Sequence, residues 1–192
     1  MANLLREYIR ELLAESIDPN IMSQIDKAEK LGIKMELHVG GLYGSVTVFD
    51  GHDHIGGGDW EKPEGGKCNG AEMVSSSGMS HGLGPLLYDV AIEASQGLMS
   101  DRMEVSAEAE AVWQRYMTSR PDVEVIQLDI NNDYQLPQLT PDNEYDDCEQ
   151  VPAYDMHKED WHTSPLSKMY KKSGTPVIDE LRSRGILKDH GR

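Results

Sequence analysis

The sequence predicts a mixed α/β fold of the α+β kind, in which a mainly antiparallel, twisted sheet is flanked by helices. Three observations lead to this prediction. Apolar residues recur with helical spacing before residue 32 and alternate with polar residues from Ile33 onward. Glycine-containing turns separate the alternating segments. A strand-like run at 69–76 then leads through closely spaced glycines into an apolar helix at 83–95.

The first 31 residues predict two helices that precede the sheet. Residues 3–15 carry an apolar stripe on an otherwise charged helix, formed by Leu5, Tyr8, Ile9, Leu12 and Leu13. Asp18 and Pro19 are an N-cap and a first-turn proline for a second helix that runs to about Leu31, with Gly32 just past its end. We expect residues 1–15 to be dispensable for folding and interpret them as a candidate targeting segment.

The next segment predicts an antiparallel meander. Three runs alternate with period two, IKMELHV, GSVTVFD and HIGGGDWE. Gly40–Gly41 joins the first two runs, and Asp50–Gly51, a strong hairpin signal, joins the second and third.

Strands and helices alternate after the meander. The strand at 69–76 and the helix at 83–95 are followed by a short strand near 97–101, a helix at 106–119 with Ser106 as N-cap, and a strand at 123–128. We therefore assign residues 32–130 to one α/β core.

The chain beyond the core divides into two parts. Residues 131–163 are rich in Asp, Asn, Pro and Gln without a sustained period, which predicts an acidic flexible linker. Residues 164–192 predict a helical C-terminal segment, because Ser164–Pro165 and Thr175–Pro176 are each an N-cap followed by a first-turn proline. The expected helices are 165–171 and 176–184, the second ended by Gly185.

Charge and composition restrict the partners. The net charge is −16, from 34 acidic and 18 basic residues. Such a charge repels phosphate backbones and anionic lipids, so we expect neither a nucleic-acid nor a membrane partner. A solvated acidic surface is the simplest interpretation, and attraction of a basic acceptor or mimicry of DNA are the alternatives. No apolar run reaches the length of a membrane span.

The cysteines and metal-ligating residues predict neither a zinc site nor a disulfide framework. Cys68 and Cys148 are far apart in sequence and outside any CxxC spacing, which fits a reducing, cytoplasmic location. The adjacent residues 52–54, His-Asp-His, cannot easily converge on one ion. The acidic run 142–149 lacks the central Gly of an EF-hand loop. We therefore expect no metal.

The segment 68–95 is the strongest functional signal. A helix that begins after Gly82 and Gly84 directs backbone N–H groups and the positive end of its dipole outward, and neither glycine has a Cβ to exclude a phosphate. The segment predicts an anion-binding turn, with an ordinary strand–turn–helix junction as the alternative.

The residues of this turn resemble a known motif. A strand ending in Val74, the pattern His81-Gly82-Leu83-Gly84 and the pair Leu86–Leu87 resemble the acetyl-CoA loop of the GNAT superfamily of N-acetyltransferases, although Met79 stands where that family has Gln or Arg. The order of elements over residues 33–130 also resembles the GNAT core. One difference is that this family has a strand before its first helices, whereas residues 1–17 predict a helix. The resemblance implies acetyl-CoA as co-substrate, bound by Met73, Val74, His81, Gly82, Leu83, Gly84, Pro85 and Leu86.

The resemblance also implies a reaction. In the family, a strand splits from its neighbour at the cofactor, a carboxylate or a water chain takes a proton from the acceptor amine, and a tyrosine protonates the leaving thiolate. Tyr116 is the candidate tyrosine and Glu72 the candidate base. Packing of Tyr116 in the core, a solvated Glu72 on its strand and a surface histidine at His81 are the alternatives.

The first hypothesis is therefore an enzyme that moves an acetyl group from acetyl-CoA to an amine of a small molecule or protein. The second is a non-catalytic structural protein with a GNAT-like fold, packaged in a phage particle. Residues 3–15 resemble head-targeting segments of such proteins, in which a protease cuts after sequences like Leu13-Ala14-Glu15. This hypothesis places the chain in the host cytoplasm or the virion. A third hypothesis, an acidic module that recruits a basic partner, rests on charge alone.

Overall fold

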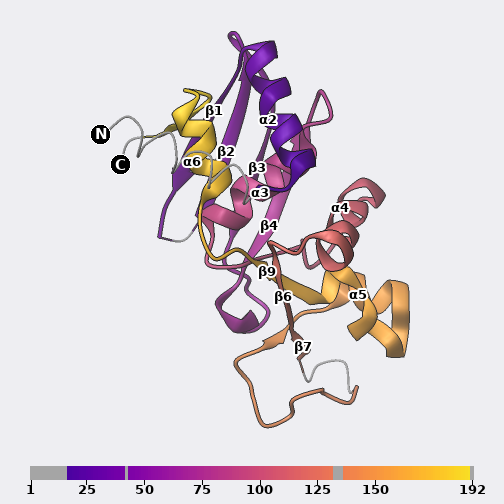
Figure 1. The fold of residues 1–192 in the computed structure, drawn as a ribbon. Helices are drawn as coiled ribbons and strands as arrows, with labels where there is room; N and C mark the ends of the chain where they lie inside the picture. The colour runs from indigo at the N-terminus through magenta and orange to yellow at the C-terminus, as the bar shows by residue number, and fades with distance from the viewer. Residues whose placement is uncertain (1–16, 42, 132–135, 191–192) are drawn as a thin grey trace, which may run out of the picture. The chain divides into compact units, whose positions relative to one another are not determined.

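The computed structural model describes residues 17–41, 43–131 and 136–190, which form two compact units. The first unit comprises residues 1–59, 77–94 and 173–192, and the second comprises residues 60–76 and 95–172. Residues 1–16, on which the predicted targeting helix falls, lie outside the described residues. Figure 1 shows the chain coloured from its N-terminus to its C-terminus.

The predicted fold class is confirmed. The described residues form a mixed, mainly antiparallel sheet of eight strands in the order β10-β1-β2-β3-β4-β5-β9-β6, together with a two-stranded sheet of β7 and β8. The α-helices are α2 (Pro19–Leu31), α3 (Gly84–Ala94), α4 (Ala107–Ser119), α5 (Val151–His157) and α6 (Pro176–Ser183). The strands are β1 (Ile33–Val39), β2 (Tyr43–Asp50), β3 (Asp53–Glu61), β4 (Glu72–Met79), β5 (Leu98–Met99), β6 (Glu124–Gln127), β7 (Asp129–Ile130), β8 (Asp147–Cys148), β9 (Lys168–Lys171) and β10 (Leu187–Asp189).

Helix α2 begins and ends where its sequence predicts. The Asp18 carboxylate accepts hydrogen bonds from the backbone N–H groups of Asn20 and Ile21, at 3.0 and 3.3 Å. Gly32 ends the helix in the left-handed conformation, with φ 74°, which a residue without a Cβ adopts at no steric cost.

The meander of the first unit is also confirmed, and β10 extends it. Strand β1 pairs antiparallel with β2, with Met35 opposite Val48, and the inward residues of both strands are buried. On its other side β1 pairs in parallel with β10, with Met35 opposite Leu187. The C-terminal segment thus supplies a strand, which the sequence did not predict, at the sheet edge next to β1.

Helix α3 is the central helix of the first unit. It contacts α2, α6 and β2, and most of its residues are buried, which accounts for its nearly uninterrupted apolar sequence. The buried carboxylate of Glu93 accepts hydrogen bonds from the backbone N–H groups of Val177 and Ile178, at 3.1 and 2.9 Å. It therefore caps the start of α6.

The second unit is built from short strands and helix α4. Strand β9 pairs antiparallel with β5 on one side and β6 on the other. The Ser106 hydroxyl accepts a hydrogen bond from the Ala109 N–H at 3.2 Å, as the predicted N-cap of α4. Trp113 and Tyr116 on α4 pack against Tyr170 of β9, with ring centroids 5.0 and 5.9 Å away.

The prediction of an irregular linker at 131–163 was wrong for the part from Asp147 onward, whereas the described residues 136–146 are turns and irregular chain. Strands β7 and β8 pair in parallel, α5 follows, and Trp161 is buried in a 3₁₀ segment at Lys158–Thr163. The predicted helix at 165–171 was also wrong. Ser164 caps a single 3₁₀ turn, Pro165–Ser167, and the chain then becomes β9, because pairing with two neighbouring strands outweighs local helix propensity.

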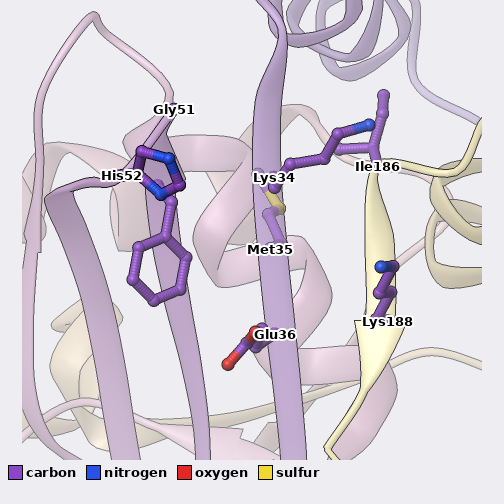
Figure 2. A pocket seen from close by; sticks show the side chains of 8 residues that line it. Lys34, Met35, Glu36, Gly51, His52, Ile186 and Lys188 are labelled. Carbon is purple, nitrogen blue, oxygen red and sulfur yellow. The ribbon is translucent and has the colours of Figure 1, made fainter.

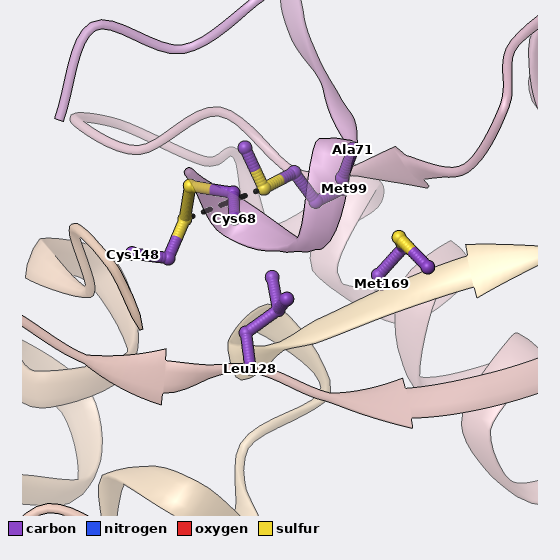
Figure 3. Close-up of a cluster of buried hydrophobic side chains, with 6 residues drawn as sticks. All are labelled: Cys68, Ala71, Met99, Leu128, Cys148 and Met169. Carbon is purple, nitrogen blue, oxygen red and sulfur yellow. Dashed lines mark hydrogen bonds between the residues drawn. A yellow bond between two sulfur atoms is a disulfide. The ribbon is translucent and has the colours of Figure 1, made fainter. Parts of the chain in front are cut away.

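Cys68 and Cys148 form a disulfide, contrary to the sequence prediction. Both residues are fully buried, and their sulfur atoms pack with Ala71, Met99, Leu128 and Met169 (Figure 3). Spacing within the sequence could not indicate this pair, because 80 residues separate the two cysteines. A disulfide persists in a non-reducing environment, so this pair points to such a compartment rather than to the expected reducing one. Among the described residues, no helix is both long and apolar enough to cross a membrane.

Candidate functional site

The predicted anion-binding turn connects β4 to α3 within the first unit. His81 and Gly82 both adopt left-handed backbone conformations, with φ of 60° and 67°. These two residues reverse the chain direction, and α3 begins at Gly84. Leu83, between Gly82 and Gly84, is fully buried and fixes the turn to the core.

The backbone N–H groups of this turn are only partly available to a ligand. Pro85 has no N–H, and the Leu86 N–H donates to the buried Gln24 side chain on α2 at 3.0 Å. Within the described chain, the Gly82 and Gly84 N–H groups donate to no other residue. An anion would therefore be held by two glycine amides rather than by a whole helical turn.

A lysine that the sequence analysis missed stands beside these amides. The Lys27 ammonium group on α2 donates a hydrogen bond to the His81 carbonyl oxygen at 2.6 Å. It lies 4.0 Å from the position that a Cβ at Gly82 would occupy. Lys27 thus brings a positive charge to the turn, where Met79 carries none. Local sequence patterns do not reveal this lysine, because the contact joins residues 54 positions apart.

The start of β4 belongs to the second unit. There, β4 pairs in parallel with β5 at two positions, Glu72 with Leu98 and Met73 with Met99. Val74 is buried, Met73 packs against the disulfide cluster, and residues 75–78 are exposed. Because β4 has eight residues and β5 has two, most of β4 continues beyond its pairing with β5.

Glu72 has the chemistry of a general base. Its carboxyl group is half-buried, and this burial raises its pKa, while the positive charge of Lys62 and the Trp60 indole N–H oppose the rise. A carboxylate with a raised pKa accepts a proton more readily at neutral pH than an ordinary one.

Tyr116 occupies an aromatic cluster in the second unit. It is 2% exposed, and its ring centroid lies 5.9 Å from those of both Trp113 and Tyr170. The Arg120 guanidinium lies over its ring at 5.0 Å. These contacts fit the core-packing alternative for Tyr116.

The structure thus brings some of the predicted site residues together. His81, Gly82, Leu83, Gly84, Pro85 and Leu86 form one turn, with Gln24 and Lys27 of α2 against it. Glu72, Met73, Val74 and Tyr116 belong to the second unit. The described residues contain no group of three or more His, Cys, Asp or Glu side chains arranged to hold a metal ion.

Comparison with known proteins gave no match to a family model, to a curated protein or to a solved structure.

Proposed function

We propose that the chain is an acyltransferase of the GNAT type, which moves an acetyl group from acetyl-CoA to an amine acceptor. The observation that carries the proposal is the course of β4. It pairs in parallel with β5 over two residues only, continues beyond β5 as the neighbour of β3, and leads through the Gly82–Gly84 turn into α3. This is the arrangement expected where a strand separates from its neighbour to bind a cofactor.

The turn supplies the pyrophosphate site of this proposal. The Gly82 and Gly84 N–H groups are donors for phosphate oxygens, and the Lys27 ammonium group provides a charge-assisted contact. The exposed stretch of β4 at 75–78 offers backbone groups to the pantetheine arm. In the transfer step that the resemblance implies, the amine nitrogen bonds to the acetyl carbonyl carbon and the thioester C–S bond breaks. By the resemblance alone, Glu72 takes the proton of the amine and Tyr116 protonates the departing CoA thiolate.

Gly84 allows a sharp test. A Cβ at Gly84 meets no atom within 4 Å, so Gly84→Leu should fold normally while its side chain fills the space of the pyrophosphate. We expect it to weaken acetyl-CoA binding more than tenfold, or about 1.4 kcal/mol, by isothermal titration calorimetry. Gly41→Leu is the matched control, because a Cβ at Gly41 also meets no atom within 4 Å and lies outside the turn. If wild-type protein binds no acetyl-CoA at millimolar concentration, the proposal is wrong.

The second candidate is a non-catalytic structural protein, packaged in a phage particle rather than retained in the host cytoplasm. Two observations favour it: the buried disulfide, which suits a non-reducing location, and the packing of Tyr116 in the core. The two candidates differ in turnover. An acyltransferase releases free CoA thiol in the presence of an amine, and loses turnover on Tyr116→Phe, whereas a structural protein releases none.

A further inference from the structure

A groove lies on the face of the first unit's sheet where β10, β1 and β2 run side by side (Figure 2). Its volume is 350 Å³, which is within the range of small-ligand sites. The lining residues are Lys34, Met35, Glu36, Phe49, Gly51, His52, Ile186 and Lys188. None of them belongs to the Gly82–Gly84 turn, so the groove is separate from the proposed acetyl-CoA site.

Strand pairing fixes which side chains meet in the groove. Lys34 on β1 lies opposite Phe49 on β2, and Glu36 lies opposite Lys188 on β10. Residues two apart on a strand share a face, so these four side chains project from the same side of the sheet. The Met35 N–H donates to the Ile186 carbonyl oxygen at 2.8 Å, and this join between β1 and the start of β10 forms the floor.

The groove combines positive charge with one aromatic ring. Two ammonium groups stand on its rim in a chain whose net charge is −16. Lys34 donates one of its three N–H groups to the Gly185 carbonyl oxygen at 2.8 Å, which holds the ammonium in place and leaves two donors. Glu36 supplies the carboxylate of the lining, and it lies 3.6 Å from the His190 imidazole. The half-buried ring of Phe49, the single Phe of the chain, forms an apolar wall.

We propose that this groove binds a small aromatic anion, with its ring against Phe49 and its anionic group between Lys34 and Lys188. The ligand needs both its aromatic ring and its anionic group. An uncharged ring leaves the two ammonium groups unused, and a free inorganic anion on an open sheet face gains only screened, solvent-exposed contacts. A ligand that carries both places its apolar body along the face of β1 and its charge at the lysines.

Phenyl phosphate is the probe for this site, and the amide chemical shifts of the full chain are the measurement. We expect saturable shifts confined to residues 34–36, 49–52 and 186–188, with binding at least tenfold tighter than that of benzyl alcohol or inorganic phosphate. Lys188→Gln and Lys34→Gln should each weaken binding at least fivefold, and Phe49→Leu should remove the preference over inorganic phosphate. Lys171→Gln, an exposed lysine on β9 of the second unit, is the matched control and should bind as wild type does.

The proposal is overturned if the shifts are spread over the surface, if benzyl alcohol binds as tightly as phenyl phosphate, or if Lys188→Gln binds as wild type does. Lys188→Gln is the decisive variant because the Lys34 contact with Gly185 also links β1 to the start of β10. The titration is independent of acetyl-CoA binding, so either proposal can fail without the other.

Discussion

The two units are stabilised by different means. In the first unit, long elements bury one regular face: α2 and α3 pack together, and β1 and β2 alternate buried and exposed residues along their length. In the second unit, five strands have only two or four residues each, β5, β6, β7, β8 and β9, and a disulfide and buried polar contacts hold the chain between them. The pattern of one short segment reveals which of its residues are regularly buried. It does not reveal which distant residues are cross-linked.

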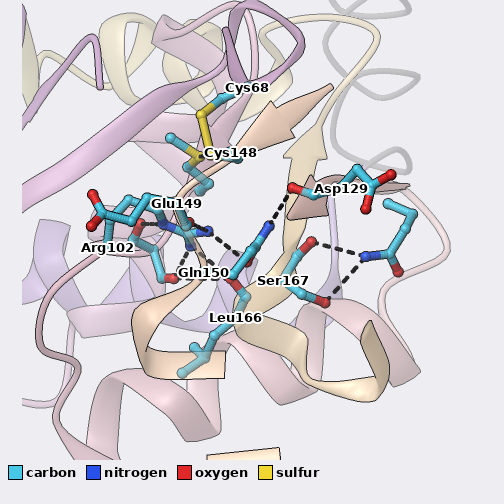
Figure 4. Close-up of a disulfide and its surroundings, with 11 residues drawn as sticks. Cys68, Arg102, Asp129, Cys148, Glu149, Gln150, Leu166 and Ser167 are labelled. Atoms are coloured by element: carbon cyan, nitrogen blue, oxygen red, sulfur yellow. Dashed lines mark hydrogen bonds between the residues drawn. A yellow bond between two sulfur atoms is a disulfide. The ribbon is translucent and has the colours of Figure 1, made fainter. Parts of the chain in front are cut away.

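Arg102 is the centre of those polar contacts (Figure 4). Its side chain is almost fully buried, and its guanidinium donates to the carbonyl oxygens of Ser100, Glu149 and Leu166 and to the side chain of Gln150. Gln150 in turn donates to the Asp129 carbonyl oxygen at 3.2 Å. One arginine therefore ties together three segments, around residues 100, 150 and 166.

The largest expected effect comes from breaking the disulfide. A link that closes a loop with a sequence separation of 80 residues stabilises the folded chain by about 4 kcal/mol through the entropy of the unfolded state. We expect the double variant Cys68→Ser, Cys148→Ser to lose about 2–5 kcal/mol in urea unfolding. Amide hydrogen exchange should increase in residues 60–76 and 136–150 and remain unchanged in α2 and α3.

Two further measurements make this result decisive. Intact mass with and without a thiol-alkylating reagent establishes that the wild-type chain carries no free thiol. Wild-type protein reduced by a dithiol in urea should then reproduce the midpoint of the double variant. Equal unfolding free energies for oxidised and reduced protein would show that the buried packing around the sulfur atoms, rather than the cross-link, stabilises the second unit.

The same contrast explains what the sequence could predict. The boundaries of α2, α3, α4 and α6 and the hairpin at Asp50–Gly51 follow from caps, prolines, glycines and periodicity, which act over a few residues. Strand β9 could not be predicted from such local signals. Ser164 does cap a turn that begins at Pro165, and only pairing with β5 and β6 makes the next residues a strand. Strand β10 was missed for the same reason: its three residues become a strand by pairing with β1.

The backbone of the candidate site could be predicted from the sequence, but the side chains that reach it from α2 could not. Gly82 could be found from the sequence because the turn has a positive φ there, and Gly84 because it stands two residues further on, at the start of α3. Lys27 and Gln24 could not, because they reach the turn from α2 across the folded first unit. Local motifs therefore locate a backbone site, whereas the side chains that complete it depend on tertiary packing.

A smaller effect is expected from removing a side chain that caps the start of a helix. Each unit has such a side chain, so the two losses can be compared directly. Glu93→Ala should destabilise the first unit by about 2 kcal/mol, because it leaves two buried N–H groups of α6 without their acceptor. Ser106→Ala should cost the second unit about 1 kcal/mol, because the N–H that it caps on α4 is exposed to water. Urea unfolding of both variants measures the difference, and a larger loss for Ser106→Ala would contradict it.

The smallest effect concerns acid stability and the ion pairs of the second unit. Burial alone would raise the pKa of Asp122, but the hydrogen bonds and charge of Arg120, at 2.8 and 2.7 Å, and the charge of Lys172 outweigh it and lower the pKa. A carboxyl group whose pKa is lower in the folded than in the unfolded state stabilises the fold at pH values above its unfolded-state pKa, which is about 3.9. That contribution disappears as the pH falls through the lower folded pKa.

We therefore expect Asp122→Asn to be less stable than wild type by a constant amount, about 1 kcal/mol, between pH 5 and 7, and the difference to shrink below about pH 4. Urea unfolding of both proteins at each pH measures it. Asp155→Asn is the control, because the Asp155–Lys158 pair is mostly exposed, at 3.7 Å, and its loss should change stability by less than about 0.5 kcal/mol at any pH. A pH-independent difference for Asp122→Asn would mean that the side chain contributes through packing and hydrogen bonding alone. The charge of the Asp122 carboxylate would then have no part in stabilising the second unit.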